Sequence, residues 1–237
     1  MKSNMILSAS GWRKVFSITN DEQDSSKNIG LENQAISVFA ALVFSDYVKE
    51  VTNKQKPTIL CGMDSRPTGS EIADATIKTL AANNVDVNFI GITAAPEIMA
   101  YSKNFDGFIY ISASHNPIGH NGIKFGLNTG GVLNGTENAK LVQKFNELCD
   151  KEDAIDYAMS ILNKANPSAV ENIYNNSPAQ KQQALLYYKN FLKETCIDKR
   201  KEKEVMLWEY YLVYATILDV NEQVQDEIIQ KYLLSEE

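Results

Sequence analysis

Short apolar segments alternate with longer amphipathic segments in the first half of the chain, and this alternation limits the fold more than any other feature. The apolar segments are rich in β-branched and aromatic residues, which favour buried strands. The segments between them show the apolar spacing of helices. The expected strands cover residues 58–63, 85–92 and 108–111, and the expected helices cover residues 31–51, 69–82 and 93–105. The pattern therefore predicts an α/β fold.

A polar loop follows the third of these strands and precedes another short strand expected over residues 123–125. It contains Ser114, His115 and further turn-forming residues, and Lys124 lies in the strand after it. Two interpretations are open. The polar residues either serve turn geometry alone, or Ser114 is a nucleophile or phosphate carrier with His115 and Lys124 supplying positive charge or proton transfer. The position favours a site, because open α/β sheets bind ligands at the carboxyl ends of their strands.

Three motifs resemble those of one enzyme family in the same order. Ser112-Ala113-Ser114-His115-Asn116-Pro117, followed by Asn121-Gly122-Ile123-Lys124, resembles the phosphoserine loop of the α-D-phosphohexomutases, the family of phosphoglucomutase and phosphomannomutase. Ser10-Gly11-Trp12-Arg13 is similar to the family's opening loop, and residues 62–69 are similar to its second loop. The resemblance covers about residues 1–150. It implies a three-layer α/β/α domain with a mixed sheet over residues 1–150, and the composition of residues 151–237 favours an all-helical segment after it.

The resemblance also implies roles for four residues. Ser114 would carry a phosphoryl group, exchange it with a hexose phosphate and serve as a magnesium ligand. His115 and Lys124 would act as active-site cations or proton carriers, and Arg13 would lie beside the phosphoserine. This is consistent with the chemistry, since phosphoryl transfer spreads negative charge over several oxygens and needs positioned cations. Asp64 and Arg66 are expected to organise the loops.

Three other predictions concern single residues or short segments. We expect His120, which lies among turn residues, to be solvated rather than catalytic. Residues 130–133 are expected to add a short strand, and residues 136–149 to form a helix.

Composition narrows the classes of partner. The formal net charge of −7 argues against nucleic acid and anionic membranes, so a phosphate site would be a local cationic pocket. Three widely spaced cysteines, Cys61, Cys149 and Cys196, indicate neither a zinc site nor a disulfide framework, which fits a reducing cytoplasm. No stretch reaches the ~20 apolar residues of a membrane span. We therefore expect a soluble, cytoplasmic chain.

The sequence changes character after residue 150, where glycine is absent and helical patterns dominate. Helices are expected over residues 179–194 and 204–220, with breaks at Asn166-Pro167 and Ser177-Pro178 and a charged linker over residues 198–204. Residues 203–224 weakly resemble a cytoplasmic segment of uncharacterised bacterial membrane proteins. They could equally form a small aromatic helical core.

The motifs that phosphohexomutases use to bind magnesium, read the sugar and clamp the substrate phosphate do not occur in this sequence. They include the Asp-Gly-Asp-x-Asp-Arg loop whose aspartates hold the metal. We therefore expect little or no activity from the chain alone, and the identity of the sugar stays open. The alternative is a non-catalytic scaffolding protein that retains the α/β fold. In either case the exposed domain face or the helical tail could support self-association or bind a partner protein.

Overall fold

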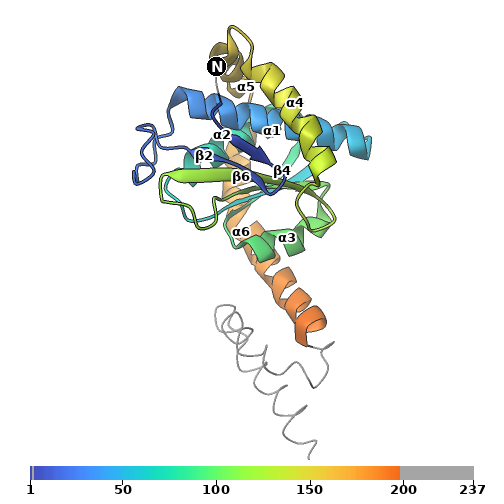
Figure 1. Ribbon diagram of the computed structural model, residues 1–237. Helices are drawn as coiled ribbons and strands as arrows, with labels where there is room; N and C mark the ends of the chain where they lie inside the picture. Colours follow the sequence, from blue (N-terminus) through green and yellow to red (C-terminus); the bar gives the residue numbers. More distant parts are fainter. Residues whose placement is uncertain (2, 198–237) are drawn as a thin grey trace, which may run out of the picture. The chain divides into compact units, whose positions relative to one another are not determined.

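The computed structural model describes residues 1 and 3–197 (Figure 1). The predicted charged linker, the predicted helix over residues 204–220 and the segment at residues 203–224 lie outside the described residues.

A six-stranded mixed sheet forms the centre of the described chain. Its strands are β1 (Ile6–Ser8), β2 (Gly11–Val15), β3 (Thr58–Met63), β4 (Asp86–Ile92), β5 (Gly107–Ile111) and β6 (His120–Leu127). They lie in the order β1-β2-β6-β5-β3-β4. Strand β3 runs parallel to β4 and β5, whereas the other neighbouring pairs are antiparallel. The four strands predicted between residues 58 and 125 are confirmed within a few residues.

Helices cover both faces of the sheet, and Figure 1 shows α1 and α4 on one side and α3 on the other. The first group contains α1 (Gly30–Thr52), α2 (Gly69–Ala82), α4 (Gly135–Cys149) and α5 (Ala154–Leu162). The opposite side carries α3 (Ala95–Tyr101), followed by a 3₁₀ turn over Ser102–Asn104. This arrangement confirms the three-layer α/β/α fold with a mixed sheet.

Successive side chains of β5 point to opposite faces of the sheet. A Cβ on Gly107 would meet Phe44 and Val48 of α1, and Ile109 and Ile111 belong to the same hydrophobic core. Because side chains alternate along a strand, Phe108 and Tyr110 point to the opposite face, where both are buried. The sheet therefore separates a large core under α1 from a smaller buried layer on the α3 side.

The hairpin of β1 and β2 was not predicted, and the expected opening loop is largely strand. Trp12 explains why: it is fully buried, contacts the rings of Phe125 and Phe145, and donates a hydrogen bond from Nε1 to Asn138 Oδ1 at 2.8 Å. These partners are more than 100 residues away in sequence, so the local pattern gave no sign of them. The short strand predicted over residues 130–133 was also wrong, since a single bridge joins Gly126 and Val132 there.

Helix α6 (Pro167–Leu192) begins at one predicted break and runs through the other. Pro167 starts the helix, where a missing N–H is tolerated. Pro178 lies inside the helix, so the predicted break at Ser177-Pro178 was wrong. Its side chain is exposed, and Tyr174 and Lys181 anchor the helix on either side of it. These contacts offset the local cost of the proline.

The two anchors belong to a compact unit over Met1–Lys181. Tyr174 packs edge-on against Phe89 at 5.7 Å between ring centroids and donates to Asp74 at 3.1 Å. Lys181 Nζ lies 2.7 and 2.8 Å from the carboxylate oxygens of Glu97, whose side chain is only 5% exposed. The predicted division into residues 1–150 and 151–237 stays a prediction, while tight packing extends to Lys181.

Within the described part of the chain, no helix has both the length and the apolar character needed to cross a membrane.

We predict that Lys181→Met lowers the free energy of unfolding by about 2–3 kcal/mol, because it leaves the buried Glu97 carboxylate without its partner. Urea titration followed by circular dichroism measures this loss. Lys181→Met combined with Glu97→Gln should recover part of it, and Lys140→Met, at an exposed position, is the matched control. A change within the error of the control would contradict the prediction.

Candidate functional site

Three neighbouring strands place candidate residues on the same face of the sheet. Strand β6 pairs antiparallel with β2 through Arg13 and Gly122, and with β5 through Tyr110 and Lys124. Since directly opposed residues share a face, Arg13, Tyr110 and Lys124 all lie on the side opposite Trp12 and α1. The sheet thus brings together residues that are nearly 100 positions apart.

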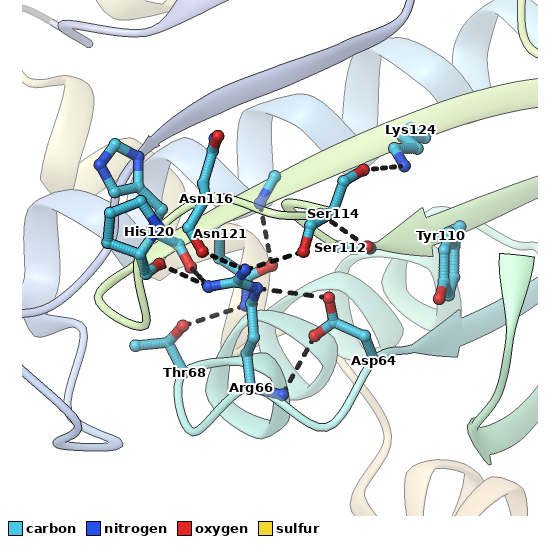
Figure 2. A network of polar contacts seen from close by, with 12 residues as sticks. Asp64, Arg66, Thr68, Tyr110, Ser112, Ser114, Asn116, His120, Asn121 and Lys124 are labelled. Atoms are coloured by element: carbon cyan, nitrogen blue, oxygen red, sulfur yellow. Dashed lines mark hydrogen bonds and ion pairs between the residues drawn. The ribbon is translucent and has the colours of Figure 1, made fainter. Parts of the chain in front are cut away.

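Lys124 reaches from this face to the predicted nucleophile. Its Nζ donates a hydrogen bond to Ser114 Oγ at 3.2 Å, as Figure 2 shows. Gly11 leaves room for this side chain, because a Cβ there would lie 2.9 Å from Lys124 Cγ. The φ of Gly11 is +135°, a conformation that other residues rarely adopt. The structure therefore brings two of the predicted site residues into direct contact.

Ser114 sits at the start of the loop after β5 with an unusual backbone. Its φ is +57°, in the left-handed region, and its side chain is exposed. The backbone N–H of Ser114 donates to Ser112 Oγ at 3.2 Å, which holds the turn. Non-glycine residues in this region are uncommon and cluster at functional sites.

Arg66 lies at the centre of the polar network in Figure 2 and holds the loop from beneath. Its guanidinium donates to the carbonyl oxygens of four loop residues at 2.5–3.2 Å, namely Ser114, Asn116, Pro117 and His120. Asp64 orients it, with Oδ2 at 3.5 Å from Arg66 Nε and Oδ1 accepting from the Arg66 backbone N–H. Asp64 and Arg66, which were expected to organise the loops, therefore pair with each other beside the loop.

Asn121 fixes the other end of the loop. It is fully buried, donates from Nδ2 to Thr68 Oγ1 at 3.0 Å, and accepts from the Gly122 N–H through Oδ1. Thr68 precedes α2, so the two loops are joined at both Arg66 and Asn121. Ser114 is therefore presented from a doubly anchored loop rather than from a free turn.

The charges at the site are mainly positive. Burial lowers the pKa of Lys124, Arg13 lowers it further, and Asp64 acts in the opposite direction. Arg13 makes long hydrogen bonds of 3.3 and 3.4 Å to Ser10, and its buried Nε has no acceptor within the described structure. Two neighbouring cations, of which Lys124 contacts the Ser114 hydroxyl and Arg13 has an unused donor, form a place suited to an anion.

The two histidines differ in exposure and in their contacts. His115 is exposed next to Ser114, and no hydrogen bond joins it to another described residue. His120 is half-buried, with Nε2 3.3 Å from Glu22 Oε2. The side chain of His120 is 22% exposed, so it is less solvated than expected, and it contacts Glu22 rather than the Ser114 hydroxyl.

Among the described residues, no group of three or more His, Cys, Asp or Glu side chains could hold a metal ion. Ser114 would be one ligand by resemblance, and the aspartates of the family's metal loop do not occur in the sequence.

Four residues of the site had no role of their own in the sequence analysis. Tyr110 was expected only as part of a strand, and Thr68, Ser112 and Asn121 were expected only as parts of motifs. The signal was available in principle, since pairing the two predicted strands in antiparallel register places Tyr110 opposite Lys124.

A family model described as phosphoglucomutase/phosphomannomutase, alpha/beta/alpha domain I, matches residues 6–152. The chain belongs to this family. The matched region contains every residue of the site described above, so the resemblance inferred from the phosphoserine loop is confirmed at the level of the phosphohexomutase domain I.

Relatives of the chain carry different names. A phosphoglucosamine mutase of Dictyoglomus thermophilum is 30% identical over 164 residues, 68% of this chain and 32% of that protein. A phosphoglucomutase/phosphomannomutase of Thermococcus kodakarensis is 31% identical over 162 residues, 60% and 35% of the two chains. A phosphoglucosamine mutase of Aliarcobacter butzleri is 41% identical over 99 residues, 41% and 21% of the two chains. The chain thus spans about a third or less of these relatives.

We predict that Arg66→Lys loosens the loop, because one ammonium cannot satisfy four carbonyl oxygens at once. Hydrogen exchange measured by mass spectrometry should be faster over residues 114–120, and the free energy of unfolding should fall by about 1–3 kcal/mol. Lys144→Met, which breaks an exposed ion pair with Glu50, is the control and should leave exchange in this loop unchanged. Unchanged loop exchange in Arg66→Lys would show that the clamp does not hold the loop.

Proposed function

We propose that this chain is the phosphoserine-bearing domain of a phosphohexomutase, in which Ser114 accepts a phosphoryl group from a hexose bisphosphate and returns it. The observation that carries this proposal is the 3.2 Å hydrogen bond from Lys124 Nζ to Ser114 Oγ, on a face that also holds Arg13. Membership of the family supports it.

The proposed step is a simple exchange. The Oγ of Ser114 forms a bond to phosphorus, the bond between phosphorus and the sugar oxygen breaks, and the serine proton ends on that sugar oxygen. Lys124 and Arg13 stabilise the negative charge that the transferring group spreads over its oxygens. Their position fits this role, since Lys124 contacts the exposed hydroxyl and Arg13 lies on the same face of the sheet, with a buried Nε that has no acceptor among the described residues.

His115 is proposed as a proton carrier. Its exposed imidazole follows Ser114 directly, so it can approach a sugar oxygen bound above the loop. A histidine side chain can both accept and donate a proton, which suits this task.

The remaining parts of the reaction are proposed to come from outside the described residues. Hexose phosphate is the proposed substrate class, and the sugar is left open because the relatives are named for different sugars. Magnesium, if required, would need ligands beyond Ser114, and a second copy or a partner protein could supply them. A cytoplasmic location would provide the sugar phosphates.

We predict that incubation with glucose 1,6-bisphosphate adds one phosphoryl group to the chain and that Ser114→Ala abolishes this gain. Intact-mass spectrometry, with and without magnesium, measures it. Ser160→Ala, which removes an exposed hydroxyl on α5, is the matched control and should gain the group normally.

Absence of Ser114-dependent gain under every metal condition would refute the proposal and favour the non-catalytic scaffold. A coupled assay for mutase turnover should stay at background for the isolated chain, because the proposed substrate contacts lie elsewhere.

We predict that Lys124→Met slows the gain of the phosphoryl group by about 10²–10³-fold, since it removes one charged donor from the reacting oxygen. The initial rate of mass gain measures the effect, with Lys140→Met as a control for loss of a surface charge. A rate close to that of the unaltered chain would exclude Lys124 from the transfer step.

A further inference from the structure

A groove lies between the outer edge of β4 and one side of α6. Its volume is about 400 Å³, and both of its walls belong to the compact unit over Met1–Lys181. Residues 84–89 line one wall, and Ala169, Asn172, Ile173, Asn176 and Gln180 line the other. Because α6 lies beyond residue 152, where the family match ends, the groove is not a feature of the matched region alone.

Strand β4 is the last strand of the described sheet, so one of its edges pairs with no other described strand. The Asp86 N–H donates to the Pro57 carbonyl oxygen at 2.9 Å, which directs the backbone groups of Asp86 and, two residues later, of Asn88 toward β3. Because backbone groups alternate between the two edges of a strand, those of Val87 and Phe89 point away from β3. An unpaired edge of this kind is a template for another extended chain.

Helix α6 presents carboxamides at every fourth position along the opposite wall. Asn172, Asn176 and Gln180 line the groove, and none of the three makes a hydrogen bond to another described residue. Positions four apart on a helix are separated by about 6 Å along its axis, close to the ~6.6 Å between alternate residues of a strand. A carboxamide can both donate and accept, so this row matches the alternating N–H and C=O groups on the second edge of an extended peptide.

Two contacts show that α6 and β4 run in the same direction. The ring of Tyr174 lies 5.7 Å from that of Phe89, and Ser177 Oγ would lie 3.7 Å from a Cβ on Gly91. Later residues of the helix therefore lie beside later residues of the strand. The row of carboxamides follows the strand edge rather than crossing it at one point.

The charge of the groove narrows the class of occupant. Lys56 and Asp86 are the charged residues of its lining, they are both exposed, and their charges cancel. A phosphate-bearing ligand therefore gains no electrostatic attraction there. A sugar would leave the strand edge incompletely paired and would find no exposed aromatic ring, since Phe89 is 6% exposed. An uncharged extended peptide matches both walls.

We propose that this groove binds an uncharged, extended segment of a partner protein. The segment adds to β4 as a further strand and meets the carboxamides of α6 with its other edge. The proposal does not rest on phosphoryl transfer, because none of the residues that line the groove belongs to the site around Ser114.

The test begins by selecting binders of the full chain from a display library of short peptides made of uncharged residues. The tightest binder is synthesised with one backbone N–H methylated at a time, and isothermal titration calorimetry measures each affinity. Methylation at every second residue should weaken binding by about 10-fold or more, because only alternate N–H groups face β4. The effect should be smaller at the residues between, which face flexible carboxamides.

Two neighbouring asparagines of α6 provide a matched pair of variants. Asn176→Lys puts a long charged side chain into the groove and should weaken binding by about 10-fold or more. Asn175→Lys lies outside the groove lining and should bind as the unaltered chain does. Both positions are exposed, so both variants should fold. In the unaltered chain, bound peptide should slow hydrogen exchange at the amides of Val87 and Phe89, as measured by NMR.

The proposal is overturned if the library yields no binder, if methylation has the same effect at every residue, or if the two lysine variants bind equally well. It is also overturned if the Val87 and Phe89 amides become protected as the concentration of the chain alone rises, since a second copy then occupies the edge. No sugar phosphate is present in these measurements, so their outcome is independent of the gain of a phosphoryl group at Ser114.

Discussion

The antiparallel register of β6 against β2 on one side and β5 on the other decides where each cation of the site lies. Because side chains alternate along a strand, a slip of one residue would turn Lys124 toward α1 and bury it in the large core. Phe125, the next residue, contacts the rings of Trp12 and Phe44 and so fixes the register from the other face. The packing of the hydrophobic core therefore determines the direction in which Lys124 and the other polar side chains of the site point.

The α/β alternation and the serine loop could be predicted from the sequence because each depends on contiguous residues. Prediction failed where contacts across the chain decide the outcome. The β1–β2 hairpin depends on burial of Trp12 against α4, and the continuity of α6 through Pro178 depends on anchors at Tyr174 and Lys181. The motif located Ser114 and Lys124, but the contact between them follows from strand pairing.

The two loops of the site behave as one body because Arg66 belongs to one of them and its hydrogen-bond acceptors belong to the other. A guanidinium is suited to this, since its donors are arranged in a rigid plane. Asn121 and Thr68 add a second, buried link between the same loops. Geometry at the serine is therefore set mainly by the backbone of the loop, which leaves the exposed side chains free for chemistry.

The left-handed backbone conformation of Ser114 lowers the stability of the folded chain. For an L-residue this conformation costs about 1–2 kcal/mol, which glycine would avoid. A chain optimised solely for folding would carry glycine there. A hydroxyl at a strained backbone position is the trade-off of stability against reactivity that the proposed phosphoryl transfer predicts for this serine.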